Sequence, residues 1–271
     1  MIESFDVAVV QMCSGPDKSE NLETASRYVE QAARDGAQLV VLPELFNCLA
    51  SFRQILSQAE TIPGPTSEAM SRLARQLGIT LLSGSLCEQA DTANRGYNTS
   101  LLFNTAGELL SRYRKIHLFD VDLPQGPSIT ESAWMSPGKK CCVTNTTVAK
   151  IGQATCYDLR FPELFRRLID RGAELISVPS AFTRTTGKDH WHVLVRARAI
   201  ENQVYVAAAN QWGQHSPDLV SFGHSMLVDP WGEILAEAKN ESDQVIVATV
   251  RNERFEQIRS QVPCLNHRRL K

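Results

Sequence analysis

Two stretches of the chain, "ARDGAQLVVLPELF" (33–46) and "IDRGAELISVPSAF" (169–182), repeat one pattern and begin 136 residues apart. Each reads as the end of a helix, a Gly-Ala pair, an apolar strand, a proline and a loop that carries a phenylalanine. Such a helix–strand unit in each half of the chain predicts two facing sheets related by a pseudo-twofold, with helices on the outside.

The rest of the chain fits the same α/β class. Apolar runs typical of strands covered on both faces lie at 6–12, 38–44, 79–85, 97–103, 148–156, 175–182, 204–211, 225–238 and 243–250. Helical patterns lie near 18–35, 66–77, 162–172, 189–202 and 252–261. No Pro/Gly/Ser-rich linker separates the halves, so we expect one domain over 1–271.

Composition excludes several classes of protein. The 271 residues are 43% hydrophobic and 21% charged, with a net charge of −2, which gives no electrostatic footprint for nucleic acid. The start has no signal-peptide pattern, and no apolar run is long enough to span a bilayer. The seven cysteines include no C-x-x-C pair, so neither a disulfide framework nor a zinc ribbon is indicated. We expect a cytoplasmic, reduced protein.

Cys156 stands at a point where a cysteine can be reactive. In "ATCYDLRFPELF" (154–165) it follows an apolar strand-like run and precedes a polar turn and a helix-like run. A cysteine is usually a small buried hydrophobe. A thiol at a strand-to-helix elbow, however, can become a nucleophile when neighbouring groups favour the thiolate.

Three charged residues also occupy unusual places. Glu44 follows a strand and a proline where the second repeat carries Ser180, and sites in parallel sheets gather at such strand ends. Lys115 lies among apolar residues, where an unpaired ammonium is costly, and Glu131 lies between two Gly/Pro loops. Glutamate can act as a base towards a thiol, and a fixed lysine can stabilise a developing oxyanion. Spacing alone does not join these residues into one site.

Three segments resemble the signature segments of the nitrilase superfamily of carbon–nitrogen hydrolases: "VVLPELF" (40–46), "YRKIHLFDVD" (113–122) and "CYDLRFPELF" (156–165). The resemblance extends through "GHSMLVDPWGEILAE" (223–237) to the end of the chain. It implies a four-layer αββα sandwich, a homodimer or higher homo-oligomer, and no metal or organic cofactor.

The same resemblance implies roles for particular residues. The Glu-Lys-Cys triad of the family falls on Glu44, Lys115 and Cys156, and its further active-site glutamate falls on Glu131. The backbone N–H of Tyr157, together with Lys115, would form the oxyanion site.

Within the superfamily the chain resembles the Nit branch, whose members are amidases. "RFPEL" (160–164) and "FGHSM" (222–226) imply hydrolysis of deaminated glutathione to 2-oxoglutarate and cysteinylglycine, a metabolite-repair reaction. Arg160 is the candidate partner for a substrate carboxylate, and an ion pair with Glu163 is its alternative. Action on α-ketoglutaramate is the second reading of the substrate, and hydrolysis of a nitrile is the third.

Other patterns suggest competing functions. Six histidines leave a Cys-His hydrolase open, although a structural role is the simpler interpretation of His117. His190 and His192 form an H-x-H pair that would place two rings on different faces of a helix, which disfavours a shared metal. We expect Arg196, Arg198 and Glu201 to form a partly buried ion-pair network. An inactive scaffold on the same fold is the alternative to an enzyme.

Overall fold

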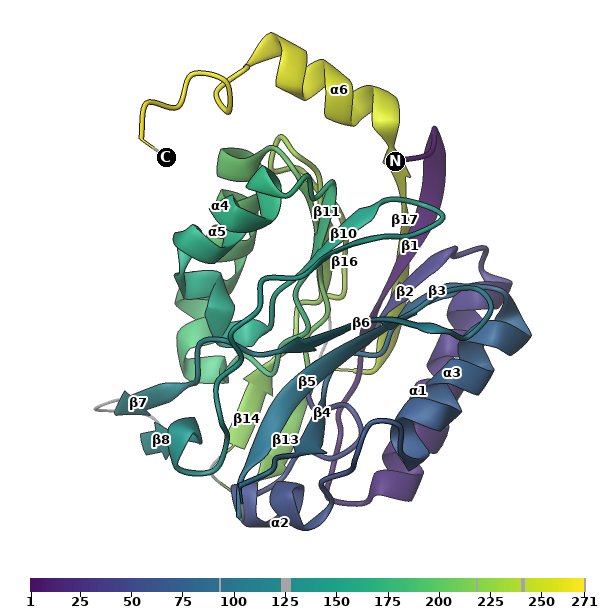
Figure 1. Cartoon of the computed structure of the whole chain (residues 1–271), viewed down its shortest axis with the longest axis vertical. Coiled ribbons are helices and arrows are strands. Elements are labelled where there is room, and N and C mark those ends of the chain that lie inside the picture. Colours follow the sequence, from purple (N-terminus) through teal and green to yellow (C-terminus); the bar gives the residue numbers. More distant parts are fainter. Residues whose placement is uncertain (93, 123–127, 218, 240–241, 271) are drawn as a thin grey trace.

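The computed structural model describes residues 1–92, 94–122, 128–217, 219–239 and 242–270. Its central elements are two separate β-sheets, one built mainly from the first half of the chain and one from the second half, with helices on their outer sides (Figure 1). Within the described residues, no helix is both long and apolar enough to cross a membrane.

The first sheet is built from the N-terminal half and the last strand of the chain. Its strands lie in the order β17-β1-β2-β3-β5-β4, with β6 paired to β5. They are β1 (Ser4–Gln11), β2 (Leu39–Val41), β3 (Thr80–Leu82), β4 (Leu86–Gln89), β5 (Gly96–Phe103), β6 (Leu109–Arg114) and β17 (Gln244–Arg251). β1, β2 and β3 run parallel, and the outer strands pair antiparallel to their neighbours.

The second sheet has the order β16-β15-β12-β11-β10-β9. Its strands are β9 (Val143–Asn145), β10 (Lys150–Gln153), β11 (Leu175–Ser177), β12 (Tyr205–Ala208), β15 (Met226–Val228) and β16 (Ile234–Glu237). Again the three central strands, β10, β11 and β12, run parallel. Two short antiparallel ribbons stand apart: β7 (Asp120–Asp122) with β8 (Ser128–Thr130), and β13 (Trp212–Ser216) with β14 (Leu219–Phe222).

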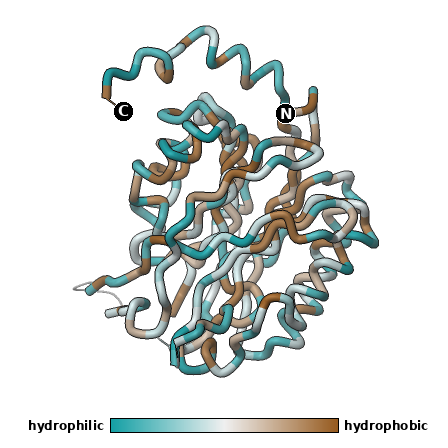
Figure 2. The backbone as a smooth tube through the Cα atoms, in the orientation of Figure 1, coloured by the Kyte–Doolittle hydropathy of each residue, from teal (hydrophilic) through white to brown (hydrophobic). Residues whose placement is uncertain are grey.

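Three apolar layers separate and cover the sheets. Side chains of both sheets, including Val9, Leu39, Leu175 and Leu227, form a fully buried central layer between them. The helices α1 (Lys18–Arg34) and α3 (Pro65–Leu77) pack on the outer face of the first sheet, and α4 (Pro162–Asp170) and α5 (Arg184–Asn202) pack on the second. Figure 2 shows hydrophobic segments concentrated along the central strands. The fold is therefore the four-layer αββα sandwich that the resemblance implied.

The two repeats fold alike. After each helix, Gly36 and Gly172 adopt left-handed φ angles of 93° and 86°, which glycine reaches without strain. The next residue, Ala37 or Ala173, donates its N–H to the carbonyl five residues earlier, and the chain then enters β2 or β11. The repeat in the sequence is thus also a repeat in the local backbone, and the pseudo-twofold stays a prediction. The assignment of all 271 residues to one domain stays a prediction, which the shared central layer favours.

Several predicted boundaries change. α5 begins at Arg184, five residues before the predicted start, and the helix α2 (Phe52–Ser57) was not predicted. The run 225–238 is not one strand but the hairpin β15–β16, because Asp229 accepts the N–H groups of Trp231 and Glu233 in a tight turn. The helix α6 (Asn252–Gln261) follows β17 and lies away from both helix layers in Figure 1.

The expected ion-pair network on α5 is only partly present. Arg198 pairs with Glu201 and also donates to the carbonyl of Leu159, the third residue after the Cys156 elbow. Arg196 does not join this pair and instead donates to the carbonyl of Gly232. The expectation was wrong for Arg196. Residues two positions apart on a helix point in different directions, so the side chains of Arg196 and Arg198 diverge.

The central layer supplies the first prediction. Leu175→Ala removes a fully buried side chain from between the sheets, so we expect the free energy of unfolding to fall by about 2–5 kcal/mol. Denaturant unfolding measures this loss. Leu270→Ala, at a side chain that is 89% exposed, is the control and should change stability by less than about 0.5 kcal/mol. Equal losses in both variants would contradict the assigned core.

Candidate active site

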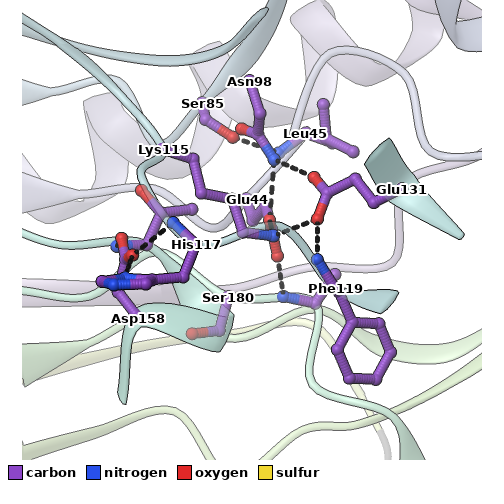
Figure 3. Close-up of polar contacts among 12 residues, drawn as sticks. Glu44, Leu45, Ser85, Asn98, Lys115, His117, Phe119, Glu131, Asp158 and Ser180 are labelled. Atoms are coloured by element: carbon purple, nitrogen blue, oxygen red, sulfur yellow. Dashed lines mark hydrogen bonds and ion pairs between the residues drawn. The ribbon is translucent and has the colours of Figure 1, made fainter. Parts of the chain in front are cut away.

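Lys115, Glu44 and Glu131 form a buried charge cluster at the ends of the strands. The Lys115 ammonium lies 2.9 Å from the Glu44 carboxylate and 2.8 Å from that of Glu131. All three side chains are at most 4% exposed. Figure 3 shows them pointing toward one another from different segments. Since each ion in such a setting is costly without a partner, the cluster holds its members in one geometry.

Backbone and side-chain donors fix both carboxylates. Glu44 accepts the N–H of Ala181 at 2.8 Å, and Glu131 accepts the N–H of Phe119 at 2.6 Å. Asn98 of β5 donates its amide to Glu44 at 2.8 Å and to Glu131 at 3.3 Å (Figure 3). Ala181 belongs to the second half of the chain, so one of these bonds joins the two halves.

Sequence reasoning missed Asn98. Its only signal in the sequence is an amide inside the strand-like run YNTSLLF, where Thr99 and Ser100 are also polar, and only the structure shows that Asn98 is 1% exposed. A buried amide needs partners, and two carboxylates require its nitrogen rather than its oxygen to face them.

Cys156 begins the short 3₁₀ helix η2 (Cys156–Arg160), directly after the end of β10 and Ala154-Thr155. Its φ angle is 45°, a left-handed value that is uncommon for residues other than glycine. Its N–H donates to the carbonyl of Pro179 at 2.9 Å, which ties the elbow to the second repeat. Backbone strain of this kind often marks functional positions. Leu45, next to Glu44, is likewise left-handed, with φ of 51°.

Asp158 connects the elbow to the segment that carries Lys115. This fully buried carboxylate accepts the hydroxyl of Tyr113 at 2.6 Å, the N–H of Thr155 at 2.8 Å and the N–H of His117 at 3.1 Å. The His117 ring also lies 2.7 Å from it and stacks on Phe161. His117 is therefore structural, as predicted, and Asp158 fixes Cys156 relative to Lys115.

The charges set the protonation states of the thiol and the ammonium. Burial and the nearby Glu44 carboxylate raise the pKa of Cys156 well above its ordinary value, against the opposing effect of Lys115. Burial alone would lower the pKa of Lys115, but Glu131 and Glu44 together raise it well above its ordinary value. Both shifts favour the protonated thiol and the charged lysine.

A cavity of about 80 Å³ opens above these groups and is lined by Glu44, Lys115, Glu131 and Cys156. The rest of its wall is mostly apolar: Leu45, Leu49, Ala50, Phe52, Ile55, Phe119, Ile129, Ala181, Thr183 and Leu219. Such a wall excludes water and strengthens the electrostatic effect of the charges inside it. The arrangement suits attack of a sulfur nucleophile on a small polar group.

Arg160 lies outside this wall, as the described residues define it. Its guanidinium is 3.3 Å from Nδ1 of His190 and lies over the rings of Phe182 and Tyr157. The described contacts of Arg160 thus differ from the alternative expectation of an ion pair with Glu163. Whether Arg160 binds substrate stays a prediction, as does the oxyanion role of the Tyr157 N–H.

A family model and several known proteins are similar to this chain over nearly its whole length. The family model for carbon-nitrogen hydrolases matches residues 6–260. The omega-amidase NIT2 of Xenopus tropicalis is 42% identical over 98% of this chain and 95% of its own length. The deaminated glutathione amidase of Synechocystis is also 42% identical, over 98% of this chain and 99% of its own.

Solved structures of nitrilase-superfamily proteins and amidases are also similar to this chain. Nit3 of Saccharomyces cerevisiae, a member of branch 10 of the nitrilase superfamily, superposes with a TM-score of 0.89 and 38% identity over 99% of this chain and 97% of its own. An amidase from Nesterenkonia has a TM-score of 0.79 and 28% identity over 96% of this chain and 99% of its own. In that structure, which is of a mutant, acrylamide has added to the active-site cysteine of the amidase.

The electrostatics of the thiol give the second prediction. Glu44→Gln removes the charge that raises the pKa of Cys156, so the thiol should ionise at lower pH in the variant, even though the variant has lost its base. Ultraviolet absorbance of the thiolate across a pH titration measures this, with Cys156→Ser as the background for the other six cysteines. An unchanged or higher thiol pKa would show that Glu44 does not act on Cys156.

Proposed function

The chain belongs to the carbon–nitrogen hydrolase family of the nitrilase superfamily and is an amidase-type hydrolase, and we propose that it cleaves its amide through a thioester on Cys156. The observation that carries this mechanism is the strained Cys156 at the wall of a cavity that also exposes the Lys115, Glu44 and Glu131 cluster.

In the first step Glu44 takes the thiol proton while the sulfur attacks the amide carbonyl carbon. A raised pKa of Cys156 favours proton transfer that is coupled to the attack. The carbonyl oxygen becomes an oxyanion, which Lys115 and the N–H of Tyr157 stabilise. Loss of one such donor typically costs about 100- to 1000-fold in rate.

In the second step the tetrahedral intermediate collapses. The C–N bond breaks, Glu44 returns its proton to the departing amine, and the acyl group stays on Cys156 as a thioester. A water molecule then attacks the thioester while Glu44 accepts its proton. The C–S bond breaks, the carboxylic acid leaves, and the sulfur regains a proton.

Glu131 is proposed to position Lys115 rather than to transfer a proton. Its carboxylate accepts from the Lys115 ammonium and from the N–H of Phe119, so it fixes the direction in which the ammonium points. With two carboxylates around it, the lysine stays charged at the pH of the reaction.

The substrate we propose is deaminated glutathione, cleaved to 2-oxoglutarate and cysteinylglycine. Support comes from the "RFPEL" and "FGHSM" segments and from a relative that carries this activity in its name. Arg160 would meet a carboxylate of the substrate at the outer edge of the site. The runner-up is omega-amidase action on α-ketoglutaramate, since a relative of that name is equally identical, and a nitrile ranks third.

We also infer a cytoplasmic homodimer. All seven cysteines are free, which suits a reducing compartment. Val193, Ile200 and Trp231 are 66%, 47% and 56% exposed, and exposed apolar side chains of this size favour an interface. An inactive scaffold is disfavoured because it would not need to maintain a costly buried charge cluster.

The nucleophile gives the third prediction. Cys156→Ser should lower kcat by at least about 1000-fold while leaving thermal unfolding unchanged, because a hydroxyl is much harder than a thiol to activate. Steady-state release of amine measures turnover. Cys87→Ser, at another buried cysteine outside the cavity wall, is the matched control and should retain activity. Near-normal turnover by Cys156→Ser would refute the thioester mechanism.

The substrate gives the fourth prediction and tests the proposed function. We expect kcat/KM for deaminated glutathione to exceed that for α-ketoglutaramate and for a simple nitrile by at least about tenfold, which corresponds to about 1.4 kcal/mol of transition-state discrimination. Side-by-side kinetics on one preparation decide the matter. A tenfold preference for α-ketoglutaramate would move the assignment to omega-amidase.

A further inference from the structure

A second cluster of potential ligands lies outside the active-site cavity wall. His192 of α5, His224 in the segment before β15, and Glu237 of β16 bring their side chains together. His192 Nε2 lies 2.8 Å and His224 Nδ1 lies 2.7 Å from the same oxygen, Oε1 of Glu237. The three ligand atoms all lie within 4.8 Å of one another. The mechanism proposed above uses none of them.

A strand pairing and a hydrogen bond from a buried tryptophan hold these groups in place. Met226 pairs with Glu237 across the β15–β16 ladder, which sets the glutamate beside the segment that carries His224, two residues before the strand. Trp191, the fully buried neighbour of His192, donates its indole N–H to the carbonyl of His224 at 2.7 Å. These bonds keep helix and hairpin in register with each other.

His224 itself is strained and supported. Its φ angle is 57°, and Gly223 before it is also left-handed at 76°. The imidazole stacks on Phe222, with ring centroids 4.5 Å apart, and the ring of His192 meets it edge-on at 5.1 Å. A non-glycine residue keeps such a backbone only where its surroundings determine it, and the contacts with Phe222, His192 and Glu237 position the ring.

The chemistry of the set matches a transition-metal ion. Two imidazole nitrogens and one carboxylate oxygen are the protein ligands of several three-ligand zinc sites, in which water takes the fourth position. All three side chains are partly exposed, at 35%, 33% and 17%, which leaves room for that water. Mg²⁺ fits poorly because it prefers oxygen ligands.

We propose that His192, His224 and Glu237 form a binding site for Zn²⁺ or a closely similar divalent transition-metal ion. In the structure one ring nitrogen of each histidine faces Oε1 of Glu237. To bind an ion, each ring must present a lone pair on that nitrogen. Ligands at about 2.05 Å in a tetrahedron lie about 3.3 Å apart, so small side-chain rotations suffice.

The site differs from the H-x-H pair that the sequence suggested. His190 and His192 diverge as expected: the first faces Arg160 and the second faces Glu237. His190 is therefore a matched control, since it is a histidine on the same helix, two residues away, with no place in the cluster.

The test, which provides the fifth prediction, is calorimetric titration of the whole 271-residue chain as wild type, His192→Ala, His224→Ala and His190→Ala with Zn²⁺ and, separately, Mg²⁺. Besides any Zn²⁺ bound by thiols, we expect one Zn²⁺ site in wild type and His190→Ala. This site should weaken by at least about 100-fold in His192→Ala and His224→Ala, because loss of a ligand costs at least as much as loss of a residue that hydrogen-bonds to a ligand. Mg²⁺ should give no such site. Thiols that bind Zn²⁺ contribute equally to all four proteins.

Co²⁺ spectra of the same four proteins identify the ligands. The difference spectrum of wild type minus His192→Ala should contain the ligand-field bands of Co²⁺ and no sulfur-to-cobalt charge-transfer band. Equal Zn²⁺ binding in wild type and His192→Ala, loss of the site in His190→Ala, or a sulfur signature in the difference spectrum would each overturn the proposal. Circular dichroism of the variants excludes misfolding as the cause of a loss.

Discussion

The ammonium of Lys115, buried between the carboxylates of Glu44 and Glu131, is the interaction on which the site depends. A charge in that position is strongly destabilising without partners, and each partner is itself fixed by a backbone N–H. The cluster is thereby preorganised before substrate binds. Preorganised charge in an apolar cavity does not need to reorganise when an oxyanion forms, and this is how the cluster would lower the barrier to attack on an amide.

The sandwich makes this cluster possible because it brings the ends of strands from both sheets to one place. Glu44 follows β2 of the first sheet and Cys156 follows β10 of the second, while Ala181 donates across the boundary between them. The left-handed turns at Cys156 and Leu45 aim their segments into the shared cavity. Packing in the central layer is what holds the two sheets, and hence the two halves of the site, in register.

A second layer of contacts supports the reacting groups. Asp158 binds the elbow through Thr155 and the lysine segment through Tyr113 and His117, so one buried carboxylate links the segment of Cys156 to the segment of Lys115. The pair of histidines at Glu237 uses similar chemistry at a different place, yet its ligands are partly exposed. This contrast explains the different roles that we assign. The fully buried carboxylate of Asp158 positions other residues, whereas the partly exposed carboxylate of Glu237 can bind an ion.

The sequence by itself determined the α/β class and the repeated helix–strand unit, because periodicity and turn glycines are local properties. It indicated Glu44, Lys115 and Cys156 as candidate site residues only through the resemblance of three segments to a known family, since their spacing does not join them into one site. It did not predict α2 or the β15–β16 hairpin, since short elements carry little periodic signal. Only the tertiary structure brought Asn98 between two carboxylates and His192 to His224 rather than to His190. These contacts depend on the register of strands and the packing of helices. Both bring together residues that are far apart in the chain, and no local sequence pattern encodes them.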